Sequence, residues 1–319
     1  MKIAVLDGHA LNPGDLSWDE LKKLGEVAIY ERTKPEEVIE RLKDIDAAIT
    51  NKVVISREVM EDCPKLRYIG VTATGYNIID MEAAEKRGIV VTNVPAYSTM
   101  SVAQMTFALL LELCLHVGKH SESVAAGEWS ACPDFCYWND PLIELDHKVM
   151  GIVGLGKIGQ KVAKIAVDFG MDVLYYSTHR HPDQENEHCH YAEFADLWAA
   201  SDVISLHCPL TPMTQGLINR DTIAQMKDGV MILNLARGPI VVEQDLADAL
   251  RSGKVAGAAA DVVSVEPIQA DNPLLTAPNM ILTPHIAWAP VESRKRLMQI
   301  TVENLKGFMD GHPQNVVSE

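Results

Sequence analysis

The chain has 319 residues, of which 47% are hydrophobic and 23% charged, and it carries a formal net charge of −16. This length exceeds one ordinary hydrophobic core and predicts two domains. The negative charge opposes binding to a phosphate backbone and so excludes nucleic acid as a partner; its simplest consequence is solubility. No apolar run is long enough to cross a bilayer, and the first residues, MKIAVLDGHALNPGD, predict a strand rather than a signal peptide. We therefore expect a cytoplasmic protein with no membrane contact.

Six cysteines are present, and none of them forms a CxxC pair. Cys132 and Cys136 are spaced CxxxC, while Cys189 lies between His188 and His190. Because neither group has a second ligand pair at a zinc-like spacing, we expect free thiols and no metal site.

The first part of the chain alternates short β-branched runs with helical stretches. Strands are predicted at residues 3–6, 27–30, 47–50, 68–71 and 90–92. Helices are predicted at 35–42, entered through Thr33, at 56–62 with Ser56 as the N-cap, and at 81–87, ending before Gly88. This alternation predicts a five-stranded parallel sheet covered on both faces, as in flavodoxin-like domains.

A long apolar helix is predicted at residues 101–117, followed by a loop rich in Cys, Trp and Pro at 127–141. The helix is apolar nearly all round, so we expect it to be buried between domains or at a subunit interface. Together the helix and the loop present more apolar surface than one subunit should expose, which predicts a two-fold homodimer.

A second strand and helix series begins at residue 149. Strands are predicted at 149–153, 173–176, 203–206, 230–234, 257–261 and 280–282, with intervening helices at 158–169, 194–200 and 243–252. This is the rhythm of a doubly wound nucleotide-binding sheet. A last amphipathic helix, 291–309, has no strand after it and is expected to pack back on the first domain. The predicted class is α/β, with a Rossmann-type domain at 98–290 inserted in a flavodoxin-like substrate domain at 1–97 plus 291–319.

A glycine pattern, GxGxxG, opens the second series at Gly154, Gly156 and Gly159. An apolar strand precedes it, a helix follows, and a second strand comes at the right distance, which together predict dinucleotide binding. Gly154 would allow the tight turn, Gly156 the approach of the pyrophosphate, and Gly159 close helix–strand packing. The free N–H groups of the helix N-terminus would face the phosphates.

The strand after this helix ends before Ser177, where a dinucleotide site normally carries a carboxylate for the adenosine ribose. Ser177 provides none, and Arg180 follows three residues later. A hydroxyl followed by a cation favours a 2′-phosphate, so NAD or NADP is expected, with a lean toward NADP. The alternative is that Arg180 is only a solvated surface charge.

Three chemically suited side chains follow consecutive predicted strands: Arg237, Glu266 and His285. Reduction of a 2-keto acid needs a cation for the carboxylate, a general acid for the alkoxide, and a carboxylate that favours the protonated acid. All three residues lie past carboxyl ends of strands, where open parallel sheets bind ligands. Singly, each could be a surface Arg, a helix-capping Glu or a core His, but their shared placement favours a catalytic set.

The chain resembles the D-isomer-specific 2-hydroxyacid dehydrogenase family over nearly its whole length. The matching stretches are VTATGYNIID, NVPAYSTMSVAQMTFALLL, GIVGLGKIGQ, LHCPLTPMTQGLIN, NLARGPIVVEQDLADAL and LTPHIAW. The resemblance implies that Arg237, Glu266 and His285 are the catalytic trio, and that Thr74 and Gly75 bind the substrate carboxylate through backbone N–H groups. It further implies a cofactor lining made of Lys157, Ile158, Pro209, Thr214, Ala236 and Asp261.

Two positions depart from the family pattern. Ser177 replaces the usual Asp, which leaves the choice of cofactor open, and Gln104 stands where many members have Glu. Trp288 and the aromatic stretch 135–138 are most similar to the glycerate dehydrogenase and hydroxypyruvate reductase branch. Formate dehydrogenases pair the histidine with glutamine, so Glu266 argues against formate.

The predicted function is hydride transfer between NAD(P)H and C2 of a small 2-keto or 2-hydroxy acid of D configuration, with hydroxypyruvate or glyoxylate as the expected acid. Another acid, such as D-lactate, is the alternative within the family. An NAD(H)-sensing binding protein of the corepressor type is the alternative from another class, since such proteins resemble the same scaffold. The resemblance also implies a homodimer formed through the nucleotide-binding domains.

Overall fold

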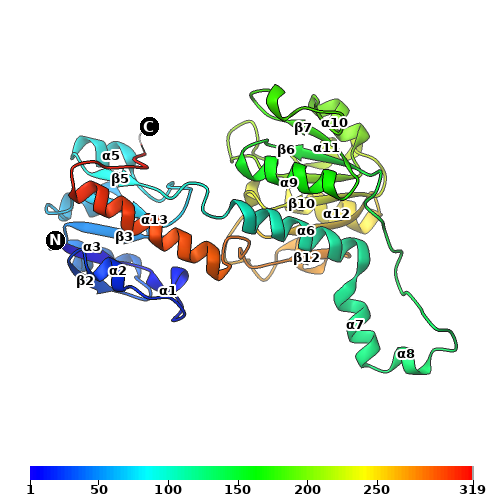
Figure 1. Ribbon diagram of the computed structural model, residues 1–319, viewed down its shortest axis with the longest axis horizontal. Helices are drawn as coiled ribbons and strands as arrows, with labels where there is room; N and C mark the ends of the chain where they lie inside the picture. The colour runs from blue at the N-terminus through cyan, green and yellow to red at the C-terminus, as the bar shows by residue number, and fades with distance from the viewer. Residues whose placement is uncertain (318–319) are drawn as a thin grey trace. The chain divides into compact units, whose positions relative to one another are not determined.

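The computed structural model describes residues 1–317 and divides into two compact units (Figure 1). Unit 1 consists of Met1–Ser98 with Ala289–Glu319, and unit 2 of Thr99–Trp288. Each unit is built on a wholly parallel sheet flanked by helices, so the predicted α/β class is confirmed.

Unit 1 contains a five-stranded sheet in the order β2-β1-β3-β4-β5. Short runs of β-branched and small apolar residues form it, and three of these strands have hardly a residue exposed to solvent. The strands are β1 (Lys2–Val5), β2 (Glu26–Ile29), β3 (Ala47–Thr50), β4 (Tyr68–Val71) and β5 (Val90–Thr92). The first two begin and end one residue earlier than expected, and the other three match.

The helices of unit 1 are short except for the last. They are α1 (Gly8–Leu11), α2 (Asp19–Lys22), the 3-10 turn η1 (Pro35–Glu37), α3 (Val38–Leu42), α4 (Arg57–Asp62), α5 (Met81–Lys86) and α13 (Val291–Met309). Ser56 caps α4 by accepting from the Val59 N–H, as expected. The prediction that Thr33 opens the helix at 35–42 is wrong: Lys34 precedes the first turn, and the Thr33 hydroxyl donates to the Leu6 carbonyl.

The C-terminal helix α13 packs along β4 within unit 1. Leu297 and Leu305 are fully buried. The guanidinium of Arg294, 8% exposed, makes two hydrogen bonds of 2.7 and 2.6 Å to the carboxylate of Asp15. A two-pronged pair of this kind, with its guanidinium buried, fixes the helix in register as well as in place.

Unit 2 contains a seven-stranded sheet in the order β12-β11-β10-β9-β6-β7-β8. The strands are β6 (Val149–Val153), β7 (Asp172–Tyr176), β8 (Cys189–Tyr191), β9 (Val203–Leu206), β10 (Val230–Asn234), β11 (Val255–Ala260) and β12 (Met280–Leu282). The strand order reverses between β6 and β9, which is where doubly wound sheets bind their ligands.

Helices cover both faces of this sheet (Figure 1). One face carries α6 (Thr99–Leu115) and α9 (Lys157–Asp168). The other carries α10 (Phe194–Ala200), α11 (Arg220–Gln225) and α12 (Glu243–Ser252). Shorter turns are η2 (Pro182–Gln184), η3 (Gly238–Ile240) and η4 (Pro273–Thr276), while α7 (Val117–Ala125) and α8 (Glu128–Ala131) follow α6.

Helix α6 begins and ends two residues earlier than predicted and packs within its own unit. It ends at Leu115, and His116, with φ of +48°, breaks the chain direction before α7 begins at Val117. Nine of its 17 residues are buried, largely against α9 and β11, and the rings of Phe107 and Phe169 stack at 5.4 Å. The sheet of unit 2 therefore accounts for much of the apolar surface that the sequence suggested for an interface.

Within residues 1–317, no single helix has the length and apolar composition to cross a membrane. Helices α6 and α7, which meet at an angle of 56°, pass that test only when they are taken together.

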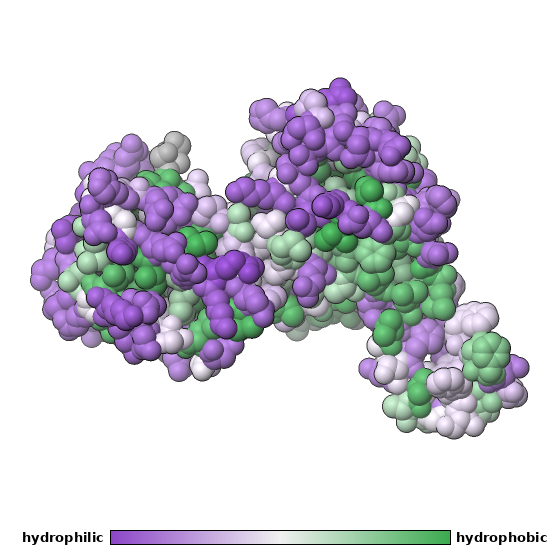
Figure 2. Space-filling model, viewed as in Figure 1, coloured by the Kyte–Doolittle hydropathy of each residue, from purple (hydrophilic) through white to green (hydrophobic). Residues whose placement is uncertain are grey.

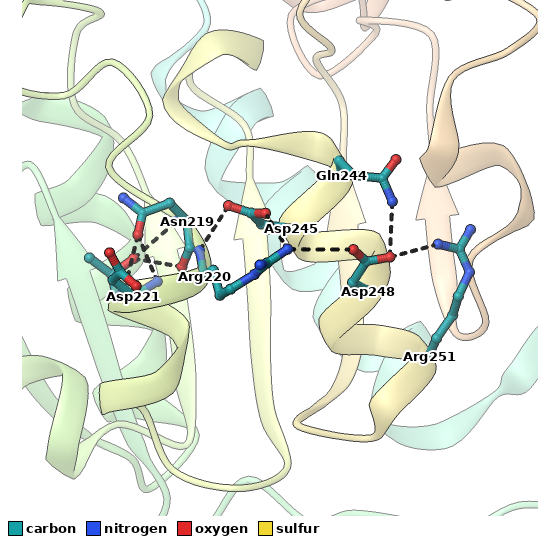
Figure 3. A network of polar contacts seen from close by, with 8 residues as sticks. Asn219, Arg220, Asp221, Gln244, Asp245, Asp248 and Arg251 are labelled. Atoms are coloured by element: carbon teal, nitrogen blue, oxygen red, sulfur yellow. Dashed lines mark hydrogen bonds and ion pairs between the residues drawn. The ribbon is translucent and has the colours of Figure 1, made fainter.

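A surface network of charged side chains joins α11 to α12 (Figure 3). The Arg220 backbone N–H donates to Asp245 at 2.9 Å, and its guanidinium lies 3.6 Å from the same carboxylate. On α12, Asp248 accepts from Gln244 at 2.9 Å and from Arg251 at 3.2 Å. These exposed contacts tie two helices together.

Candidate functional site

The glycine turn after β6 is shaped by steric limits. Gly154 has φ of +99°, and a Cβ there would lie 2.7 Å from the Cys208 backbone nitrogen. A Cβ on Gly159 would lie 2.1 Å from the Gly154 carbonyl oxygen, whereas a Cβ on Gly156 would meet nothing within 4 Å. Two glycines are thus required by the fold itself, and the third leaves open space at the N-terminus of α9, where N–H groups favour an anion.

The residues at the start of α9 and at the end of β7 adjoin this turn. Lys157 opens α9 after the N-cap Gly156, which has no side-chain cap, and Ile158 packs partly on the core. The Gly154 N–H donates to the Tyr176 carbonyl at 2.8 Å, so Ser177 follows directly from the strand end bonded to the glycine turn.

Arg180 is held by the carboxylate of Glu185, in the loop after β7. Its Nε and Nη2 donate to the two oxygens of Glu185 at 2.6 and 2.7 Å. The Tyr175 hydroxyl donates to the same carboxylate at 2.9 Å. The hydrogen bond from the Arg180 guanidinium holds the pKa of Glu185 down at about 2, so the pair is ionised at pH 7.

His207, after β9, lies against the other side of the glycine turn, since a Cβ on Gly154 would be 2.8 Å from its carbonyl carbon. Its ring Nε2 is 2.8 Å from the Ser205 hydroxyl. Its Nδ1 is buried and, within residues 1–317, has no hydrogen-bond partner. Burial lowers the pKa of His207 to about 4, so the ring is neutral at pH 7. A buried ring nitrogen without a protein partner, in a residue next to the glycine turn, is consistent with a site that binds a polar ligand.

Glu266 and His285 form a direct pair. His285 Nδ1 lies 2.7 Å from Glu266 Oε2, and the other oxygen of Glu266 accepts from the Val263 N–H at 3.4 Å. Their side chains are 29% and 33% exposed, so both remain open to a ligand. Because Nδ1 faces the carboxylate, Nε2 is the nitrogen of His285 left for a substrate.

The turn that carries His285 is closed by Asp261. This residue is 2% exposed and accepts from the Thr283 hydroxyl at 2.6 Å and from the Ile286 and Ala287 N–H groups at 2.8 Å each. His285 itself has φ of +54°, a left-handed conformation that costs a non-glycine residue about 1–2 kcal/mol. The three bonds to Asp261 hold the turn in that conformation.

Arg237 projects from a turn that packs on the backbone leading to Glu266. Asn234, at the end of β10, accepts from the Ala236 N–H at 3.1 Å and donates to the Arg237 carbonyl at 3.0 Å. A Cβ on Gly238 would lie 2.0 Å from the Val263 carbonyl carbon, so only glycine permits this close approach. The Arg237 side chain is exposed, and its Nη1 donates to the Ala236 carbonyl at 2.7 Å.

The remaining expected residues have identifiable surroundings. The Thr214 hydroxyl donates to the Pro209 carbonyl at 2.7 Å and closes the turn after β9. In unit 1, the Thr74 hydroxyl donates to the Val94 carbonyl at 3.0 Å. Within residues 1–317, the backbone N–H groups of Thr74 and Gly75 donate to no protein acceptor.

Sequence reasoning missed three contributors to these surroundings: Glu185, His207 and Asn234. The strand ends in the sequence point to His207 and Asn234, which occupy positions equivalent to those of the expected catalytic residues. No periodic signal points to Glu185. All six cysteines are free, and within residues 1–317 no group of His, Cys, Asp and Glu side chains could hold a metal ion.

Comparison with known proteins identifies the family of the chain. Residues 107–287 match the family described as D-isomer specific 2-hydroxyacid dehydrogenase, NAD binding domain. The chain is 57% identical over 322 residues to hydroxypyruvate reductase from Blautia hydrogenotrophica, which covers all of both chains. It is 35% identical over 319 residues to glycerate dehydrogenase from Methylorubrum extorquens, covering 99% of this chain and 98% of that protein. A solved acyclic imino acid reductase in complex with NADPH and D-Arg is 30% identical, with a TM-score of 0.86 over 99% of this chain and 100% of its own. The chain therefore belongs to the D-isomer specific 2-hydroxyacid dehydrogenases, a family of NAD-binding oxidoreductases.

Proposed function

We propose that this dehydrogenase reduces hydroxypyruvate and glyoxylate with NADH or NADPH, forming a 2-hydroxy acid of D configuration where C2 becomes a stereocentre. The observation that carries the proposal is the contact of 2.7 Å between Nδ1 of His285 and Oε2 of Glu266. Both residues follow strands of the sheet that also carries the glycine turn. The choice of acid rests on the hydroxypyruvate reductase, 57% identical over the whole chain, and on glyoxylate reductases such as that of Korarchaeum cryptofilum, 39% identical over 289 residues.

Unit 2 is proposed to bind the dinucleotide at the glycine turn. The open space at Gly156 and the uncapped N-terminus of α9 fit a pyrophosphate, and Lys157 and Ile158 would flank it. Pro209, Thr214 and Ala236 would line the remainder of the site, with Ser177 beside the adenosine ribose. When bound, the dinucleotide supplies the hydride for reduction or accepts it in the reverse direction.

His285 is proposed as the general acid in reduction. Its Nε2 would donate a proton to the oxygen of C2 as negative charge develops there. Glu266, bonded to Nδ1, fixes the orientation of the ring and places a carboxylate beside it. In the oxidative direction the same nitrogen would accept the hydroxyl proton.

Arg237 is proposed to hold the carboxylate of the acid and to polarise its keto group. A planar guanidinium can bind a carboxylate with two parallel hydrogen bonds. This local cation is needed because the chain as a whole, at −16, repels anions. On the family resemblance, Thr74 and Gly75 are proposed to bind the substrate carboxylate through their backbone N–H groups.

We propose that residues 1–97 plus 291–319 form the substrate domain and that residues 98–290 form the NAD(P)-binding domain.

We also propose a homodimer formed through the NAD(P)-binding domain. Figure 1 shows α7, α8 and the chain after them reaching away from the sheet of unit 2. Phe135 is 88% exposed and Trp138 63%, and apolar or weakly polar residues cover much of this arm in Figure 2. A second copy of the chain would bury these aromatic side chains. Light scattering should give twice 35.1 kDa, and Phe135→Asp with Trp138→Asp should return the monomer; a wild-type monomer contradicts this proposal.

The assay is a panel of hydroxypyruvate, glyoxylate, pyruvate, 2-ketoisocaproate and phenylpyruvate, each with NADH and with NADPH. We expect the highest kcat/KM for hydroxypyruvate or glyoxylate. If pyruvate is preferred, D-lactate dehydrogenase becomes the better description. If no acid oxidises either cofactor although both bind, the chain is a sensor rather than an enzyme.

Cofactor choice is tested at Ser177. Because no carboxylate stands there, NADPH is expected to be accepted, and Ser177→Asp should shift the ratio of the two affinities toward NADH. Rejection of NADPH by the wild-type protein, by roughly a thousandfold, would contradict the accommodation of a 2′-phosphate.

A further inference from the structure

The loop after β7 contains a closed ion pair next to the expected ribose position. Arg180 and Glu185 make two parallel hydrogen bonds of 2.6 and 2.7 Å. The Arg180 side chain is 61% exposed, whereas that of Glu185 is only 16% exposed. The carboxylate is therefore the fixed member of the pair and the guanidinium the accessible one.

Glu185 is anchored from the sheet as well as from the loop. The hydroxyl of Tyr175, a fully buried residue of β7, donates to Glu185 at 2.9 Å. The same hydroxyl accepts from the His181 backbone N–H at 2.9 Å, which ties the chain after Arg180 to this point. The Tyr191 ring lies 5.7 Å from the guanidinium on the side of β8. The loop thus offers Arg180 a defined resting position on Glu185.

The position of the pair matters because of what adjoins it. Tyr176 is bonded to the glycine turn, and Ser177, Thr178 and His179 alone separate it from Arg180. An arginine this close to the ribose position would attract a 2′-phosphate if its charge were free. Paired with Glu185, it presents no net charge, and the carboxylate adds repulsion toward a phosphate dianion.

We propose that Glu185 is a specificity-determining residue: by neutralising Arg180 it restrains binding of the 2′-phosphate and keeps NADH competitive with NADPH. This inference rests on the proposed dinucleotide site at the glycine turn. It assigns to Glu185 the restraint that a carboxylate at position 177 would otherwise provide. Cofactor preference in this chain is then a balance between Ser177 and Arg180, which admit the phosphate, and Glu185, which opposes it.

The opposite role for Glu185 predicts the opposite result. If the carboxylate served to orient Arg180 toward the 2′-phosphate, its removal would leave the guanidinium without a fixed position and would weaken NADPH binding. The sign of the change therefore separates restraint from positioning.

The experiment measures dissociation constants of NADPH and NADH by calorimetry, without substrate, for wild type and Glu185→Gln. We expect Glu185→Gln to tighten NADPH about tenfold and to leave NADH unchanged, a scale between an exposed ion pair and a hydrogen bond to a charged group. The gain should shrink at high ionic strength because Arg180 is exposed. Equal or weaker NADPH binding by Glu185→Gln overturns the proposal.

Three further variants complete the test. Asp183→Asn removes one negative charge from the same loop, where Asp183 bonds Gln184 rather than Arg180, and should leave the ratio unchanged. Arg180→Gln added to Glu185→Gln should cancel the gain. Tyr175→Phe, which removes one of the three hydrogen bonds to Glu185 without changing charge, should tighten NADPH by a smaller factor; it provides the answer if Glu185→Gln does not fold. If the wild type binds neither cofactor, the dinucleotide site itself is wrong; if it binds both and Glu185→Gln leaves the ratio as it was, only the restraint is wrong.

Discussion

Asp261 gives the sharpest link between packing and activity, because its carboxylate closes the turn that presents His285. Asp261→Asn keeps the size of the side chain but leaves one acceptor oxygen where there were two. In wild type one oxygen of Asp261 accepts from the Thr283 hydroxyl and the Ile286 N–H, and the other accepts from the buried N–H of Ala287. At least one backbone donor loses its partner, at a cost of about 1–3 kcal/mol in the free energy of unfolding.

The loss should also appear in catalysis. Without these bonds the left-handed conformation of His285 is no longer held, and a displacement of about 1 Å at a reacting group costs on the order of a hundredfold in rate. The family resemblance implies that Asp261 lines the cofactor, but its carboxylate is 2% exposed and already accepts from three protein donors. We therefore expect kcat for Asp261→Asn to fall by about ten- to a hundredfold while the dissociation constant for cofactor stays the same. Urea unfolding, steady-state kinetics and cofactor titration measure the three quantities.

Two controls frame this result. Thr283→Val removes a single neutral donor and should cost about 1 kcal/mol with little change in kcat. Asp248→Asn, in the exposed network between α11 and α12, should change stability by less than about 0.5 kcal/mol. A higher cofactor dissociation constant with normal kcat for Asp261→Asn would refute the reasoning, because it would make Asp261 a cofactor ligand and not the support of His285.

The other predictions concern the proton, the carboxylate and acid stability. Glu266→Gln keeps the shape of the pair but removes its negative charge, so kcat for reduction should fall by about tenfold or more; an unchanged kcat would assign the charge to another carboxylate. Arg237→Lys should lower kcat/KM roughly ten- to a hundredfold, since a point cation cannot make the two-pronged grip; a loss under twofold would exclude such a grip. His207 stays neutral in the fold down to pH about 4, while in the unfolded chain it takes up a proton near 6.5. Stability should therefore drop as the pH falls from 6.5 toward 4, by up to about 1.4 kcal/mol per pH unit, and urea titrations of His207→Gln should show a shallower drop.

Much of the fold could be predicted because buried parallel strands are short runs of apolar residues between turn signals. Residues 47–50, 149–153 and 230–234 are of this kind, and each matches its strand in the structure. Strand β8 was missed because His188, Cys189 and His190 lack both a branched run and an alternating pattern. It forms because β7 provides a partner edge: Cys189 pairs with Val173 and is buried. Pairing across an edge is a tertiary effect that a local pattern does not contain.

The candidate site was predictable to the extent that strand ends gather at one edge of a sheet. The pairing of Glu266 with His285 needed only two adjacent strands and suitable chemistry. The support from Asp261 and the restraint from Glu185 were not predicted, because both depend on how irregular turns fold back. A loop has no period, so the sequence alone left Arg180 as either a phosphate ligand or a surface charge; the structure shows it bound to Glu185.

The central claim, that His285 gives the proton that completes hydride transfer to a 2-keto acid, is tested most directly by single-turnover kinetics. Wild type and His285→Ala are each saturated with reduced cofactor and mixed with hydroxypyruvate, and loss of the reduced nicotinamide absorbance is followed. The account predicts rapid oxidation by wild type, and for His285→Ala equal cofactor affinity with a rate lower by about a hundredfold or more. Equal single-turnover rates for the two proteins would contradict it.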